Sequence, residues 1–204
     1  NTKYLKRCEQ TNCFKIAKFS SNELMSFKYD EPLDYFNHFW NKYEKFKSQY
    51  LKKNKESINN TYNGTAFETI MAFLMEREKV KILKMDETIK DVKFVKPDFL
   101  INSKSGNKIF ISLKVSGRER WKQAELESLW FKKKYPESIT ILLMNHERET
   151  AAAKEKIPFL DLDYAFYAGS NDLNELFENC NDAMLESMEV NDKNKRKMIL
   201  DALE

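Results

Sequence analysis

The sequence predicts an α/β protein with a central mixed β-sheet flanked by helices and a mainly helical N-terminal region. Three observations support this prediction. Residues 138–144 form a continuous apolar run, which is typical of a strand with helices on both faces of its sheet. Residues 97–101 and 108–115 form two apolar runs around a polar turn, as in a hairpin. Aromatic side chains recur at helical spacing between Leu33 and Phe46.

Composition limits the class of protein. The chain has 204 residues with 42% hydrophobic content, enough for one sizeable core, or for one core and a small appendage. A net charge of +3 does not by itself indicate a nucleic-acid partner. No apolar run approaches the ~18 residues of a membrane span and no leader opens the chain, so a soluble intracellular protein with no membrane partner is expected. Cys8, Cys13 and Cys180 lack a second Cys/His pair and are predicted to be reduced thiols.

The first 60 residues are predicted to form the N-terminal appendage. Residues 14–17 suggest a strand or loop, and a helix is expected from Asp30 and Pro32 onward. The aromatic stripe of this helix favours a core or subunit contact, with stacking on nucleotide bases as the alternative. A polar stretch at 52–61 places the predicted boundary at residue 60. The expected role of the appendage, residues 1–60, is in dimerisation or DNA contacts. Residues 61–204 would form the main domain, and one continuous domain is the alternative.

A second, strongly apolar helix is predicted to open at Thr65, with Glu68 at the capping-box position. The carboxylate of Glu68 then has two interpretations: it caps the helix, or it points into a functional site. Residues 80–85 and 92–96 alternate as strands, and the second run leads directly into Pro97 and Asp98.

Polar and charged side chains that could form a catalytic site are expected to lie close together in the predicted hairpin. The period of two in the second strand puts Phe110, Ser112 and Lys114 on one face. Lys114 should therefore leave its strand beside Asp98 of the neighbouring strand. A charged helix is expected to follow Gly117 and to end before Pro136.

The rest of the chain completes the sheet. Residues 147–156 suggest a helix or loop, residues 159–168 a strand, and residues 173–177 and 192–203 helices. Asp161 and Asp163 share a strand face and resemble a metal pair, but they rank below Asp98 because no lysine lies near them in sequence.

Carboxylates that converge with a lysine at a sheet edge are suited to metal-assisted phosphodiester hydrolysis. Asp98 is the first candidate ligand. The position two before the lysine should carry a second carboxylate, and it is Ser112, which cannot replace a charged ligand. An acid of the following helix must then reach the same point. Positions 120, 124, 127 and 131 share a helix face, which favours Glu127 over Glu125.

This segment resembles the PD-(D/E)XK nucleases, in particular the EcoRII-like branch of type II restriction endonucleases, whose active-site glutamate has moved to the following helix. The resemblance rests on Pro97-Asp98, with fifteen residues between Asp98 and Lys114, and on Glu127, with twelve residues between it and Lys114. The run from Arg118 to Gln123, Arg-Glu-Arg-Trp-Lys-Gln, continues it. Val115 and the short interval after Asp98 depart from the family pattern.

The resemblance implies a restriction-endonuclease-like core that cleaves double-stranded DNA with Mg²⁺ at a short, palindromic site containing G·C pairs. Asp98 and Glu127 would hold the metal, assisted by Glu68 and, as an alternative, by Glu125, and Lys114 would orient or activate the attacking water. A homodimer in a prokaryotic cytoplasm, with a DNA methyltransferase as its functional partner in a restriction-modification system, is also implied.

Base reading is expected next to this site. Arginine can bind guanine bidentately and a carboxylate can accept from cytosine, so Arg118, Glu119 and Arg120 can read G·C pairs. Ser116 and Lys122 complete the predicted DNA-binding set. There are two alternatives to base contact: Arg120 supports the active site, or residues 118–120 form a solvated charged surface.

Two other functions remain open at this point. One is a less specific repair or recombination nuclease of the same fold. The other is a DNA-binding module whose nuclease site has decayed, with Ser112 as a mark of decay.

Overall fold

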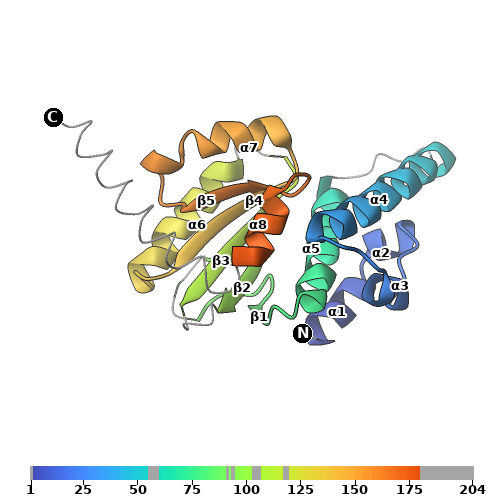
Figure 1. Ribbon diagram of the computed structural model, residues 1–204, viewed down its shortest axis with the longest axis horizontal. Coiled ribbons are helices and arrows are strands. Elements are labelled where there is room, and N and C mark those ends of the chain that lie inside the picture. Colours follow the sequence, from blue (N-terminus) through green and yellow to red (C-terminus); the bar gives the residue numbers. More distant parts are fainter. Residues whose placement is uncertain are drawn as a thin grey trace. The chain divides into compact units, whose positions relative to one another are not determined.

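The computed structural model describes residues 2–54, 60–90, 92, 95–102, 107–116 and 120–179 (Figure 1). The chain divides into two compact units, residues 1–82 and 83–204, and each is described by itself. Within the described residues, no helix is both long and apolar enough to cross a lipid bilayer.

The first unit is helical, as the sequence predicts. Its helices are α1 (Thr2–Glu9), α2 (Asn12–Ile16), α3 (Ser21–Ser26), α4 (Pro32–Asn54) and α5 (Asn60–Arg77). Helix α5 contacts each of the other four. Its side chains at residues 70–75 are fully buried, so α5 is the central helix of this unit.

The aromatic stripe of α4 is core. Tyr35, Phe36 and Phe39 are at most 1% exposed, and the ring of Phe36 lies 5.6 Å from that of Phe67 on α5. Burial on this scale makes the stripe part of the hydrophobic core of the unit and leaves these rings unable to stack on bases.

Two local predictions in this unit are wrong. Residues 14–17 belong to α2 and its end rather than to a strand, because the Thr11 hydroxyl accepts the Phe14 amide and caps a helix there. Helix α5 begins at Asn60, so Thr65 lies inside it and donates its hydroxyl hydrogen to the Thr61 carbonyl over 2.9 Å. Glu68 is therefore not part of a capping box.

The division between the units follows Ile82, whereas the boundary was predicted at residue 60. The apolar helix α5 accounts for the difference, because it packs against α1–α4 and so belongs with the N-terminal helices. A role of residues 1–60 in dimerisation or DNA contacts stays a prediction.

The second unit contains a mixed five-stranded sheet of order β1-β2-β3-β4-β5. The strands are β1 (Ile82–Lys84), β2 (Phe99–Asn102), β3 (Lys108–Lys114), β4 (Ile139–Met144) and β5 (Tyr164–Tyr167). Strands β2 and β3 are antiparallel, while β3–β4 and β4–β5 are parallel. The predicted hairpin and the apolar strand at 138–144 are confirmed.

Helices cover both faces of this sheet (Figure 1). They are α6 (Arg120–Lys134), α7 (Glu147–Lys154) and α8 (Asp172–Asn179). Ala124 of α6 and Ala153 of α7 belong to one apolar cluster with Leu142 and Met144 of β4. Helix α8 packs against β5 on the face opposite α6. All residues of β4 are buried, as expected for a strand covered on both sides.

Two predicted strands differ from the structure. In the run 92–96, Val92 donates its amide to the Ile89 carbonyl in a turn, and Val95 packs in a cluster with Leu100 and Phe110. The run 159–168 is shortened to β5, because residues 157–159 form a 3₁₀ turn that contains Pro158.

Cys8 and Cys13 are buried free thiols, in agreement with the prediction for them. Cys180, the predicted helix at 192–203 and most of the hairpin turn lie outside the described residues.

Candidate active site

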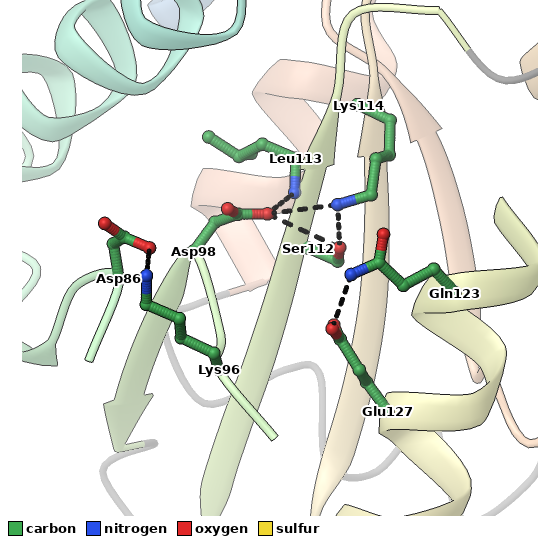
Figure 2. Close-up of polar contacts among 8 residues, drawn as sticks. All are labelled: Asp86, Lys96, Asp98, Ser112, Leu113, Lys114, Gln123 and Glu127. Atoms are coloured by element: carbon green, nitrogen blue, oxygen red, sulfur yellow. Dashed lines mark hydrogen bonds and ion pairs between the residues drawn. The ribbon is translucent and has the colours of Figure 1, made fainter. Parts of the chain in front are cut away.

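Asp98 lies at the start of β2, beside the end of β3. Phe99 pairs with Ile111, which brings the preceding residue next to Ser112 and Leu113. The Asp98 carboxylate accepts a hydrogen bond from the Leu113 backbone amide at 2.5 Å (Figure 2). Its Oδ2 also lies 3.4 Å from the Ser112 hydroxyl and 3.5 Å from the Lys114 ammonium.

Lys114 is held from two sides. Its Nζ donates to the Ser112 hydroxyl over 2.8 Å and forms an ion pair with Asp98. The side chains of Lys114 and Asp98 are 13% and 18% exposed, and Ser112 is 1% exposed. Partial burial strengthens the attraction between these charges relative to water. The predicted proximity of Lys114 and Asp98 is therefore present in the structure.

Glu127 reaches the same place from α6. Ala124 and Phe131 of α6 are fully buried against the sheet, and the Phe131 ring lies 5.3 Å from Phe110 of β3. Glu127 is on the same side of the helix and accepts a hydrogen bond from Gln123 over 2.9 Å. Figure 2 shows its side chain extending from α6 toward the group around Lys114. Glu125, two positions earlier on the same helix, is partly buried.

Burial raises the pKa of the Asp98 carboxyl above its ordinary range. The Lys114 charge and the Leu113 amide oppose this shift, and the negative charge of Asp86 adds to it. Burial also raises the pKa of Glu127, against the effects of Gln123 and Lys114, and Asp98 adds a smaller contribution in the same direction. The two carboxyl groups therefore interact electrostatically with each other and with the same lysine.

This donor set fits a hard divalent cation. Burial disfavours the ionised form of both carboxyls, and a nearby cation would stabilise that form. Carboxylate oxygens are also the ligands that Mg²⁺ prefers. Among the described residues, no group of three or more His, Cys, Asp or Glu side chains is arranged to hold a metal ion. Two protein ligands are nonetheless compatible with Mg²⁺, which keeps several waters and binds substrate phosphates.

The remaining predicted site residues belong to the first unit, to the ends of β3 and α6, or to the part of the chain outside the described residues. Glu68 is partly buried on α5 in the first unit, where its charge contributes to the raised pKa values of Cys8 and Cys13. Ser116 and Lys122 are exposed, just after β3 and on the first turn of α6. Arg118 and Glu119, and the side chain of Arg120, lie outside the described residues.

Asp163 has a structural role. Its carboxylate accepts the Thr140 amide at 2.8 Å and the Thr140 hydroxyl at 3.0 Å, and it pairs with Lys132 at 2.5 Å. These contacts tie the segment before β5 to β4 and to α6. The lower rank of Asp161 and Asp163 as metal ligands agrees with this arrangement.

Sequence reasoning did not identify three groups near the site. They are the Leu113 backbone amide, Asp86 and Lys96 (Figure 2). The strand register could have indicated the Leu113 amide, because this group of β3 faces Asp98, the residue before β2. No sequence pattern marks Asp86, whose proximity depends on the turn after β1.

No protein-family model matches the chain, and no curated protein matches it. Its structure is similar to a solved complex of the restriction endonuclease PspGI with substrate DNA, with a TM-score of 0.51 and 18% sequence identity. The match covers 89% of this chain and 82% of that one. Together with the mixed sheet and flanking helices, this similarity shows a restriction-endonuclease-like fold.

Proposed function

We propose that this chain is a type II restriction endonuclease that uses Mg²⁺ to hydrolyse phosphodiester bonds in double-stranded DNA. The observation that carries the proposal is the convergence of Asp98, Lys114 and Glu127 at the end of β3. The likeness of the fold to that of a restriction endonuclease supports it.

Asp98 and Glu127 would hold the metal, with Glu68 of the first unit as a proposed third carboxylate. When bound, Mg²⁺ polarises the scissile phosphate and lowers the pKa of a coordinated water. Burial raises the pKa values of Asp98 and Glu127, and a bound cation would favour the ionised form of both carboxyls.

Lys114 would orient the attacking water or take its proton. Its ammonium lies between Asp98 and Ser112, so its position is fixed before the substrate arrives. Because Ser112 is neutral, Lys114 has one anionic partner in Asp98, just before β2, and a second charge interaction with Glu127 on α6.

DNA recognition would lie beside this chemistry. Arg118, Glu119 and Arg120 are proposed to contact bases, and the exposed Ser116 and Lys122 to contact DNA near them. A homodimer would cut both strands of a palindromic site, and a DNA methyltransferase would protect the same site in a prokaryotic cytoplasm.

Digestion of unmethylated DNA of known sequence, with and without Mg²⁺, tests the proposal. Discrete fragments that require the metal support a restriction enzyme, and their ends give the site. A metal-dependent smear would favour the less specific nuclease of the same fold. Retardation of DNA without cleavage would favour the decayed binding module.

A further inference from the structure

Asp86 contacts the segment that carries Asp98. It follows β1 in a left-handed backbone conformation, with φ of 51°. Its amide donates to the carbonyl of Pro97 at 3.0 Å and also lies 3.3 Å from the carbonyl of Asp98. One backbone N–H is thus shared between two consecutive carbonyls next to the proposed catalytic carboxylate.

The side chain of Asp86 holds the same segment at a third point. Its carboxylate forms an ion pair with Lys96 at 2.5 Å (Figure 2). Residues 96, 97 and 98 are therefore each bound by Asp86, two through its amide and one through its carboxylate. Lys96 is 51% exposed and Asp86 30% exposed, so this attachment is at the surface, beside the buried cluster.

The position of Asp98 depends on such an attachment. The regular pairing of β2 with β3 begins at Phe99, so Asp98 lies just outside the ladder. Its carboxylate must nevertheless meet the Leu113 amide and the Lys114 ammonium. A shift of about 1 Å in a reacting group can cost ~10²-fold in rate, so residues that fix the backbone on this side affect the chemistry.

We propose that Asp86 is a positioning residue: through Lys96 and the Pro97 and Asp98 carbonyls it holds the Asp98 carboxylate against Leu113 and Lys114. The effect of Asp86 on DNA cleavage rests on the function proposed above. The effect of Asp86 on the position of Asp98 is independent of that function.

The residue type suits this role. Aspartate and asparagine adopt left-handed backbone conformations more readily than other non-glycine residues. Of these two, only aspartate supplies a negative charge for Lys96. Asp86→Asn thus keeps the backbone contacts and removes the charge, whereas Lys96→Met removes the same ion pair from the other side.

The Leu113 amide reports the position of Asp98 without any DNA. In a proton–nitrogen NMR spectrum, its resonance and its hydrogen-exchange rate depend on the hydrogen bond to the Asp98 carboxylate. We expect Asp86→Asn and Lys96→Met each to move this resonance and to speed its exchange by about tenfold. The double variant should change little further, because both substitutions break one contact.

Lys84→Met is the matched control. Lys84 is the last residue of β1, two positions before Asp86, and it contacts Glu87 at 4.0 Å and the Thr88 carbonyl at 3.4 Å rather than residues 96–98. This variant should leave the Leu113 amide as in the unsubstituted protein. Like Lys96→Met, this variant removes one positive charge from the surface, so it controls for the change in net charge.

Cleavage is the second measurement. Asp86→Asn and Lys96→Met should lower kcat with little change in KM, at an unchanged melting temperature. An unaltered Leu113 amide in both variants would overturn the inference whether or not the protein cuts DNA, as would an unchanged kcat in a protein that cuts. Failure of the unsubstituted protein to cut would instead refute the proposed function, and the amide result would still decide the role of Asp86.

Discussion

The ammonium of Lys114 donates a hydrogen bond to the hydroxyl of Ser112 across one face of β3, over 2.8 Å. A carboxylate at position 112 would be an anionic neighbour for Lys114, and it would also offer a bound cation a second ligand. The serine supplies neither. Because Glu127 extends from α6 toward the same lysine, the structure has a carboxylate available to take over that part of the site.

Replacement of Glu127 should separate it from Glu125 as a site residue. Glu127→Ala is expected to lower cleavage by about 10²-fold or more, as for loss of a metal ligand worth several kcal/mol. Glu125→Ala should be much milder. Cleavage rates of the two variants over a range of Mg²⁺ concentrations measure the difference, and the opposite order would move the ligand by two positions.

The raised pKa of Glu127 predicts a pH-dependent effect on stability. A carboxyl whose folded pKa lies above its ordinary value of 4.5 stabilises the fold below that value and loses this contribution as the pH rises through the folded pKa. Glu127→Gln keeps an acceptor for Gln123 but carries no charge. It should therefore raise the melting temperature at neutral pH without divalent metal, and this gain should vanish near pH 4.

Thermal melts at a series of pH values measure this effect. Glu125→Gln, the same substitution two positions earlier on α6, is the control. A lower melting temperature for Glu127→Gln at neutral pH would contradict the electrostatic description of the site.

Loss of the Asp163 carboxylate should affect stability rather than catalysis. Asp163→Ala leaves the Thr140 amide and Lys132 without this acceptor, while the Thr140 hydroxyl keeps the Asp161 carbonyl at 2.9 Å. Unsatisfied groups of this kind cost about 1–3 kcal/mol each before relaxation or hydration. We expect a lower midpoint in urea unfolding and, at temperatures where the variant is folded, an unchanged cleavage rate. A large loss of rate in the folded variant would return Asp163 to the list of site residues.

Base recognition can be tested at Arg118. If its guanidinium binds guanine bidentately, Arg118→Ala should weaken specific binding by about 1–3 kcal/mol and relax the preference at that base pair. Competition binding with single-base variants of the site, in Ca²⁺ in place of Mg²⁺, measures both quantities. An unchanged preference would exclude this role.

The sequence was most informative where periodicity and register act together. Alternation in residues 108–115 placed Ser112 and Lys114 on one face, and the helix spacing after Arg120 placed Glu127 on the buried side with Ala124. Both predictions depend only on chain geometry. The fold class followed from the same patterns.

Local signals failed where a distant segment decides the conformation. Thr65 resembles a helix cap, but α5 begins earlier because its apolar side chains are buried among the other N-terminal helices. In the alternating run before Pro97, none of the described residues is in a strand, and Val92 and Val95 pack in a cluster with Leu100 and Phe110. The proximity of Asp86 to Asp98 is equally nonlocal, since it comes from a turn after β1 that no motif marks.

If the cluster around Lys114 carries out metal-dependent cleavage, Lys114→Ala should remove that activity. We would follow plasmid cleavage by the unsubstituted protein, by Lys114→Ala and by Lys134→Ala, an exposed lysine at the end of α6, with DNA binding measured in parallel. The expected result is Mg²⁺-dependent cutting that falls by about 10²–10⁴-fold only in Lys114→Ala, with DNA binding retained. Cutting by Lys114→Ala at the rate of the unsubstituted protein would show that the chemistry lies elsewhere.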